Sequence, residues 1–208
     1  MAIKPILFNT EMVRAIMEGR KSCTRRVVKP QWEECPHCKY VHKEYIYDKL
    51  AENVYCARCG YPLLPERRAK YQPGDILYVR ETWHKYIKRV GEGKSCHLAE
   101  FYGYKASIAN SEDADEPWKP SIHMQKEAAR IWIKVTNVRV ERLQEMWASD
   151  VPKEGIYFNK PTTADEMLMA FAKLWNSTIK KSDLDSYGWN ANPWVWVIEF
   201  ERCEKPET

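Results

Sequence analysis

The chain has 208 residues and a formal net charge of +4 at pH 7, so it is long enough for one full hydrophobic core and one small appendage. It contains no run of about 18 apolar residues, which excludes a transmembrane helix, and its N-terminus lacks the apolar segment of a signal peptide. We therefore expect a soluble, cytoplasmic protein without a membrane partner. The small positive charge permits a polyanionic partner without requiring one.

The N-terminal segment predicts a strand, a helix and a second strand. Residues 3–8 favour a first strand, with a proline near its start. Residues 11–18 have apolar side chains at helical spacing, after the N-cap candidate Asn9 and before Gly19, which is placed to end the helix. Two valines at 27 and 28 then favour the second strand.

Four cations, two hydroxyls and a thiol fall within residues 19–26, between that helix and strand. Because the cluster spans a junction, we expect its side chains to converge on a pocket. Lys21 and Thr24 are the most specific candidates for a chemical role. The pKa of a desolvated lysine falls, and its amine can then deprotonate a nearby hydroxyl. An ordinary basic turn has the same composition, and spacing alone does not separate the two interpretations.

Four of the seven cysteines form two C-x2-C knuckles with 17 residues between them. This spacing is typical of a zinc site, and Gly60 follows the second knuckle where a tight turn is needed. Four thiolates close a tetrahedral shell and leave no position for water, so we predict a structural zinc ion in an inserted zinc ribbon at residues 31–66. The predicted zinc ligands are Cys35, Cys38, Cys56 and Cys59.

The rest of the chain predicts more strands than helices. A Pro-Gly turn at 73–74 opens this part, and residues 85–120 look like a charged surface excursion. The expected strands lie at residues 76–83, 99–105, 129–140 and 194–200, and the expected helices at a short segment ending at Gly155 and at residues 164–179. Strands joined by irregular connections indicate an α+β fold with a small β-barrel, formed by residues 1–30 and 70–208.

The order of these parts resembles the ASCH family (activating signal cointegrator homology), relatives of the PUA RNA-binding fold. The basic cluster is similar to the family's G-[RK]-K-x-x-T-x-R signature and residues 73–83 to its G-D-x-L-x-V-R-E-x-W strand. Residues 153–156 look like its E-G element, and residues 193–200 like its closing strand. The likeness is greatest with the larger, phage-associated members, and the zinc ribbon lies outside the basic domain pattern.

The resemblance implies a PUA-like β-barrel with flanking helices and a cleft lined by the G-x-K-x-x-T loop, which accepts RNA, a nucleoside or a modified base. In the small bacterial members that hydrolyse N4-acetylcytidine, a lysine, a threonine and a glutamate form the catalytic set. Carried across by motif, these are Lys21, Thr24 and Glu154. The present chain is about twice the size of those hydrolases, so its cleft could be covered or reshaped.

Three functions stay open. The first is a non-catalytic protein that binds RNA, a modified nucleoside or, as a further alternative, DNA. Its arginines and lysine would contact phosphates, an aromatic residue would stack on a base, and an acid and a histidine would lie beside the cleft. The predicted binding residues are Arg20, Lys21, Arg25, Arg26, Tyr78, Glu81, Trp83 and His123. A strand-end salt bridge is the alternative for the acid, and a structural role is the alternative for the histidine.

The second function is an amidohydrolase or ribonuclease. In it Lys21 acts as the base toward Thr24 or a water, and Glu154 moves the proton. The third is a phage or prophage assembly module whose ribbon docks a protein. Titration against RNA, DNA and modified nucleosides, with binding and turnover both measured, separates the first two.

Overall fold

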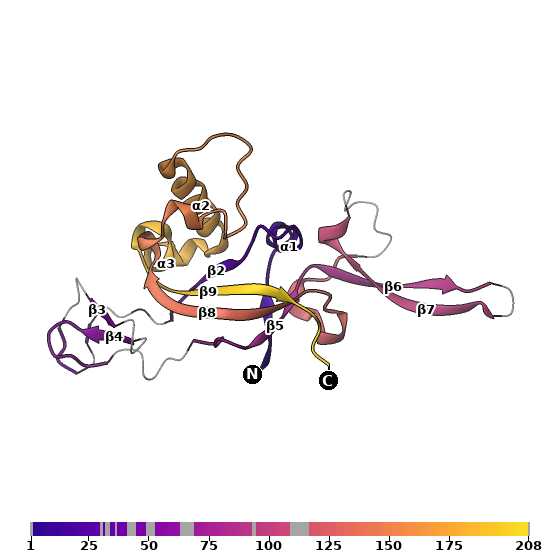
Figure 1. Ribbon diagram of the computed structural model, residues 1–208, viewed down its shortest axis with the longest axis horizontal. Coiled ribbons are helices and arrows are strands. Elements are labelled where there is room, and N and C mark those ends of the chain that lie inside the picture. The colour runs from indigo at the N-terminus through magenta and orange to yellow at the C-terminus, as the bar shows by residue number, and fades with distance from the viewer. Residues whose placement is uncertain are drawn as a thin grey trace.

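The computed structural model describes residues 2–29, 31, 34–35, 37–40, 45–48, 53–62, 69–92, 95–108 and 117–207. Its centre is a five-stranded mixed sheet with the strand order β1-β5-β8-β9-β2 (Figure 1). The strands, in that order, are Ile3–Leu7, Ile76–Arg80, Trp132–Arg142, Trp194–Cys203 and Cys23–Val27. β1 pairs with β5 in parallel, and the other three ladders of this sheet are antiparallel.

The described residues form three α-helices, which lie on one side of the sheet (Figure 1). They are α1 at Thr10–Met17, α2 at Ala164–Thr178 and α3 at Leu184–Tyr187. Asn9 caps α1 by accepting a hydrogen bond from the Met12 N–H at 2.9 Å, and Gly19 leaves the helix with φ +74°. The two longer helices therefore confirm the sequence-based expectation.

Two apolar clusters hold the helices to the sheet. Under α1, Val13 and Ile16 pack with sheet residues that include Leu77 and Ile133. Under α2, Phe171 and Trp175 pack with residues of the interior strand β9 and with Cys23 of the edge strand β2. Because both clusters use β-branched or leucine side chains of the sheet, the core lies between the sheet and the helices.

The expected barrel is not closed in the described residues. β1 and β2 are the two edges of the sheet, and no backbone ladder joins them. One side chain spans the gap instead, because Arg26 Nη2 of β2 donates to the Leu7 carbonyl oxygen at the end of β1 over 2.7 Å. We call this gap the seam; the candidate functional site lies in it.

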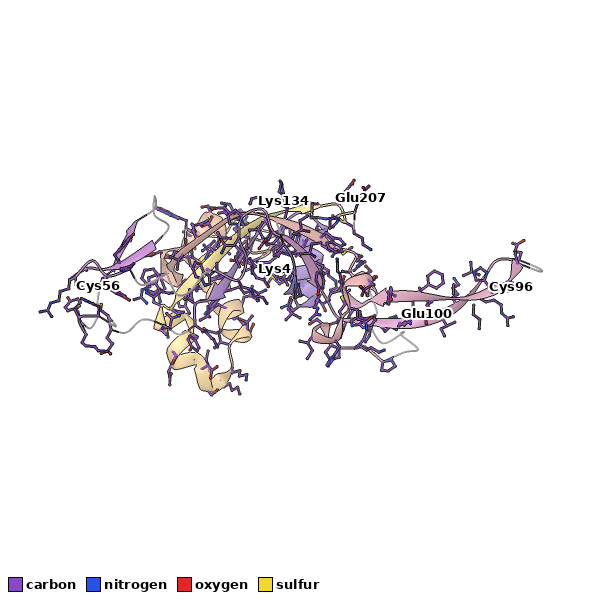
Figure 2. All side chains as sticks on the ribbon, turned by 90° about the horizontal axis from the view of Figure 1, so that it is seen from below. Lys4, Cys56, Cys96, Glu100, Lys134 and Glu207 are labelled. Atoms are coloured by element: carbon purple, nitrogen blue, oxygen red, sulfur yellow. The ribbon has the colours of Figure 1, made fainter. Side chains whose placement is uncertain are left out.

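Two further hairpins project at opposite ends of the molecule (Figures 1 and 2), with Cys56 at one end and Cys96 at the other. One hairpin consists of β3 at Tyr45–Asp48 and β4 at Asn53–Cys56. The other pairs β6 at Trp83–Val90 with β7 at His97–Tyr104. The second hairpin corrects the expectation of an irregular excursion with a single strand, whereas the acidic run 111–116 lies outside the described residues.

A second correction concerns the short helix expected before Gly155. Residues 143–145 and 148–150 form separate 3₁₀ turns, followed by a hydrogen-bonded turn at 151–153. Pro152 interrupts the segment soon after the second of them, so a continuous α-helix is not favoured there. Within the described residues, no helix has the length and apolarity needed to cross a bilayer.

Candidate functional site

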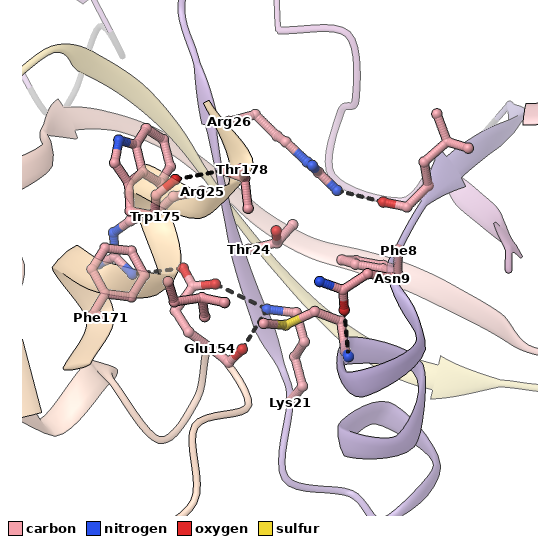
Figure 3. Close-up of a pocket in the computed structure, with 13 residues that line it drawn as sticks. Phe8, Asn9, Lys21, Thr24, Arg25, Arg26, Glu154, Phe171, Trp175 and Thr178 are labelled. Carbon is pink, nitrogen blue, oxygen red and sulfur yellow. Dashed lines mark hydrogen bonds and ion pairs between the residues drawn. The ribbon is translucent and has the colours of Figure 1, made fainter. Parts of the chain in front are cut away.

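A pocket of about 180 Å³ occupies the seam (Figure 3). One wall is a single stripe of α2, because Phe171, Leu174, Trp175 and Thr178 are spaced i, i+3, i+4 and i+7. The facing wall comes from the end of β1 and the start of α1, and the remaining lining from β2 and the loop before Gly155. An apolar cavity of about 150 Å³ binds one benzene ring, so this pocket has room for one planar ring with small substituents.

Lys21, Thr24 and Glu154 all line this pocket. The Lys21 ammonium donates three hydrogen bonds, to the Cys23 carbonyl oxygen at 2.7 Å, to the Glu154 carbonyl oxygen at 2.7 Å and to Glu154 Oε2 at 2.9 Å. Burial lowers the pKa of Lys21, and the Glu154 carboxylate opposes that effect. Since all three ammonium hydrogens are used, Lys21 is held as a cation and accepts no proton in this arrangement.

Gly155 lets Glu154 come this close to Lys21. Its φ is +94°, and an added Cβ would lie 2.8 Å from the Ala15 Cβ and 3.3 Å from the Lys21 Cβ. The loop is also fixed to the start of β2, because the Ser22 and Cys23 N–H groups both donate to the Lys153 carbonyl oxygen at 3.0 Å. The E-G element and the basic cluster are thus parts of one structure.

Arg25 is fully buried and belongs to the same network. Its Nη1 donates to Glu154 Oε1 at 2.9 Å, its Nε and Nη2 donate to Glu141 Oε1 at 3.0 and 2.7 Å, and Nη2 also lies 3.4 Å from Asp150 Oδ2. The network then continues to Arg139, Glu199 and Lys153. Within the described residues the network holds four cations and four carboxylates, so its total charge is balanced, although Arg139, Lys153 and Glu199 are partly exposed. The cations are Lys21, Arg25, Arg139 and Lys153, and the carboxylates are Glu141, Asp150, Glu154 and Glu199.

Arg26 differs from the other cations of the basic cluster. Arg20 pairs with Glu18 at 2.6 Å, and Lys21 and Arg25 pair with carboxylates of the network. Among the described residues no carboxylate pairs with Arg26, whose guanidinium lies over the Phe8 ring at 5.4 Å and bonds only to a backbone carbonyl. The lining of the pocket therefore carries one cation, Arg26, whose charge no carboxylate of the described residues neutralises.

Two neutral polar groups of the lining are also unused by the described part of the chain. The Thr24 hydroxyl has no hydrogen-bond partner there, although the residue is 5% exposed. Asn9 accepts the α1 capping bond through Oδ1 and keeps its amide N–H₂, which lies beside the pocket (Figure 3). A bound molecule can therefore find one hydroxyl, one amide donor and one guanidinium between aromatic walls.

Five of the eight predicted binding residues do not line the pocket. Tyr78 and Trp83 belong to a separate aromatic cluster around Trp132, and His123 is exposed in a 3₁₀ turn. Glu81 is buried and receives a two-point salt bridge from Arg130 at 2.9 and 3.0 Å. This pairing is the strand-end salt bridge that the sequence left open as the alternative for Glu81, and the residue lies outside the pocket lining. Arg20 is also outside the lining.

The sequence did not indicate the aromatic walls or the acids that bind Arg25. Phe171 and Trp175 fall within the helix expected at residues 164–179, but an apolar pair at i and i+4 looks the same in a core and in a pocket wall. Asn9 was identified only as a helix cap. The spacing of Phe171, Leu174, Trp175 and Thr178 was a usable signal, because the last of these puts a hydroxyl on an otherwise apolar stripe.

The four predicted zinc ligands also come together, apart from the pocket. All four sulfurs lie within 4.8 Å of one another, with Cys35 Sγ 3.7 Å from Cys59 Sγ and Cys38 Sγ 3.6 Å from Cys56 Sγ. Tetrahedral zinc with Zn–S bonds of about 2.3 Å requires sulfurs about 3.8 Å apart, so the donor set fits a zinc ion. Four sulfurs complete the coordination shell and leave no open position for catalysis.

The two knuckles have the same backbone design. The N–H of the first cysteine donates to the tyrosine carbonyl five residues later, from Cys35 to Tyr40 and from Cys56 to Tyr61. The carbonyl oxygen of the same cysteine accepts from the residue four positions later, which has a positive φ: Lys39 at +57° and Gly60 at +67°. Gly60 therefore fills the tight-turn position expected from the sequence, and Lys39 occupies the equivalent position without being a glycine.

Comparison with known proteins gives no family model and no curated protein that matches this chain. Two solved structures are similar to it. One is a hypothetical protein, PH0355, at 13% identity over 98% of this chain and 100% of that one, with a TM-score of 0.38. The other is an ASCH domain from Lactobacillus crispatus JV V101, at 10% identity over 97% of this chain and 79% of that one, with a TM-score of 0.41. At these TM-scores neither likeness bears on the function.

Proposed function

We propose that the seam pocket binds one base of an RNA strand, or a modified nucleoside, with the adjoining phosphate on Arg26. The observation that carries this proposal is an aromatic-walled pocket, sized for one ring, whose lining includes one cation, Arg26, that pairs with no carboxylate in the described part of the chain. Aromatic side chains stack on unpaired bases, and polar groups hydrogen-bond to the base edges. Phe8, Phe171 and Trp175 supply the aromatic surface, and Thr24 and Asn9 supply the polar groups.

The charge inventory makes this proposal narrower than a general basic cleft. Arg20, Lys21 and Arg25 bind carboxylates, and so they are not available to phosphates without breaking ion pairs. Arg26 alone then gives one phosphate contact. For single-stranded nucleic acid each contact changes the slope of log K against log salt by about 0.7, so the pocket contributes a slope of about 0.7 in place of about 2.8 for four contacts.

Calorimetric titration tests the proposal with a nucleoside, its 5′-monophosphate and a short RNA. Thr24→Val removes the hydroxyl at constant shape and should weaken all three ligands. Arg26→Gln should weaken the two phosphorylated ligands and leave the free nucleoside within about twofold, since only the phosphate contact is lost. Arg202→Gln is the matched control, because Arg202 also donates to a backbone carbonyl, that of Met17 at 3.3 Å, and lies outside the pocket.

Two results would contradict the proposal. Wild-type protein that binds none of the three ligands would remove the pocket as a base site. Equal losses in Arg26→Gln and Arg202→Gln would remove Arg26 as the phosphate ligand.

A second candidate function is hydrolysis of an amide on a modified nucleoside such as N4-acetylcytidine. It is favoured by the presence of Lys21, Thr24 and Glu154 in one pocket. Lys21 would first have to pass a proton to Glu154 or to water, because its three N–H groups are all engaged. Turnover of N4-acetylcytidine by the wild-type protein, lost in a folded Thr24→Val variant, would establish this function over binding alone.

A further inference from the structure

The β6–β7 hairpin forms a two-stranded ribbon that stands clear of the rest of the protein (Figure 1). Eight residue pairs connect the strands, from Trp83 with Tyr104 to Val90 with His97. At about 3.4 Å per residue the ribbon is about 27 Å long. The four outer residues of β6, from Ile87 on, are all exposed. The outer half therefore buries neither face against the described part of the protein.

This free part of the ribbon carries apolar side chains that a solvent-exposed hairpin does not need. Ile87 is 63% exposed and Leu98 is 68% exposed. In the ladder Ile87 faces Glu100 and Arg89 faces Leu98, so Ile87 and Leu98 are diagonal neighbours on one face. An isolated two-stranded hairpin is marginally stable in water. An apolar pair on such a ribbon is accounted for by a partner that covers it.

The charge of the outer half favours a polyanionic partner. Lys85, nearer the body, is neutralised by Glu100 at 2.6 Å. Lys88 and Arg89 are exposed, and no carboxylate of the described residues pairs with either one. Both follow Ile87 on the same strand, and because side chains alternate along a strand, Arg89 lies on the face of Ile87 and Leu98 and Lys88 on the opposite face. The side chains available to a partner are thus an apolar pair with one cation beside it, and a second cation on the opposite face of the ribbon.

A nucleic-acid duplex matches this combination of shape and chemistry. The major groove of B-DNA is about 12 Å wide and admits a two-stranded ribbon, and A-form RNA presents a wide, shallow minor groove. Lysine and arginine contact the phosphates of such grooves, and isoleucine and leucine lie against base edges or between base steps.

We propose that the outer half of the β6–β7 ribbon binds in a groove of a nucleic-acid duplex, with Lys88 and Arg89 on phosphates and Ile87 and Leu98 against the bases. The proposal rests on the proposed function for the kind of polymer, but it uses none of the pocket residues. A base that is paired in a duplex must leave its stack before it can enter a pocket that holds one ring. If the ribbon binds a duplex, the ligand of the pocket is therefore an unpaired base next to that duplex or a base flipped out of it.

The test is fluorescence anisotropy with fully paired DNA and RNA duplexes of about 16 base pairs, longer than the ribbon. K88Q/R89Q should lower the slope of log K against log salt by about 1.8 on DNA, the value for two lost phosphate contacts. I87S/L98S should weaken binding at an unchanged slope. K180Q/K181Q is the matched control, because it removes two adjacent exposed lysines elsewhere on the chain and should leave slope and affinity near the wild-type values. Circular dichroism verifies that each variant is folded.

Several results would overturn the ribbon proposal. One is K88Q/R89Q binding duplexes as the wild type does, and another is an equal loss in K180Q/K181Q. If I87S/L98S abolishes self-association in sedimentation without affecting duplex binding, the apolar pair contacts a second copy of the chain. If the wild type binds anionic phospholipid vesicles and no duplex, the partner is a membrane. Tighter binding of DNA would assign the major groove, and tighter binding of RNA the minor groove of the A-form helix.

Failure of the ribbon proposal can be distinguished from failure of the proposal that the pocket binds a base. Thr24→Val should lose nucleoside binding and keep binding to a fully paired duplex. K88Q/R89Q should show the opposite pattern. If only the first pattern is found, the pocket stands and the ribbon fails; if only the second is found, the ribbon stands and the pocket fails.

Discussion

Glu154→Gln should destabilise the protein by about 3–5 kcal/mol, the usual cost of removing one partner from a buried ion pair. The Glu154 side chain is 5% exposed, and its two oxygens accept from Lys21 and Arg25, which are 1% and 0% exposed. Glutamine keeps the shape of the side chain but removes its charge. The ammonium of Lys21, which is 1% exposed, then loses its carboxylate partner without gaining access to water.

Lys21→Met should cost less, about 1–3 kcal/mol. Glu154 then keeps its bond to Arg25, and the main loss is the donor for the Cys23 and Glu154 carbonyl oxygens. The two changes together should cost less than the sum of the single changes, by about 1–3 kcal/mol, because each corrects the charge imbalance that the other creates.

Urea denaturation followed by far-UV circular dichroism at pH 7 measures these differences, provided that the m-value is constant across the variants. Arg202→Gln, an exposed arginine outside the network, is the control and should stay within about 0.5 kcal/mol of the wild type. The reasoning is refuted if Glu154→Gln lies within about 1 kcal/mol of the wild type, or if Lys21→Met costs more than Glu154→Gln.

Three further predictions concern other parts of the chain. Burial raises the pKa of Asp75, but hydrogen bonds from Lys4 and two backbone N–H groups outweigh it and hold the pKa below the usual 3.8. Asp75→Asn should therefore be less stable than the wild type at pH 7, with a gap that narrows below about pH 4; thermal unfolding with an equal gap at pH 7 and pH 3 would contradict this. Burial and the nearby Glu154 charge raise the pKa of Cys23 to about 12, so its thiolate fraction at pH 8 is about 10⁻⁴. Mass spectrometry after native alkylation should show exposed Cys96 modified well before Cys23, and equal rates would count against the assignment. Protein prepared without added zinc should contain about one equivalent of it, and Cys56→Ser should lose the metal and loosen residues 31–66 while the sheet unfolds at nearly the same temperature. Absence of metal, or global unfolding of Cys56→Ser, would reject the inserted-ribbon interpretation.

The sequence predicted the features that a few neighbouring residues determine. The cysteine knuckles depend on spacing within four residues, and α1 and α2 on caps and apolar repeats within one element. The pairing of Lys21 with Glu154 spans 133 positions, so no local pattern specifies it. The family resemblance supplied it, and the structure adds the physical reason, which is the positive φ and close approach at Gly155.

The sequence-based expectations differ from the structure where contacts between distant parts of the chain decide the outcome. Glu81 has the same sequence neighbours whether it lines a cleft or pairs with Arg130, because that partner comes from a different element. The β6–β7 ribbon was missed for a different reason. Apolar and polar residues alternate only when one face of a strand is buried, and the outer ribbon buries neither face.

The position of the pocket explains why a costly buried ion pair is compatible with the fold. A closed barrel would place β2 about 4.8 Å from β1, which leaves no room for a pocket between them. In this chain the edges are bridged by the Arg26 side chain, and the Lys21–Glu154–Arg25 network fixes β2 to the loop before Gly155. Well-packed apolar residues in place of a buried ion pair are often neutral or stabilising, but here they would fill the polar end of the pocket. Stability alone therefore does not favour the ion pair, whereas the proposed site for a polar ring beside a phosphate would.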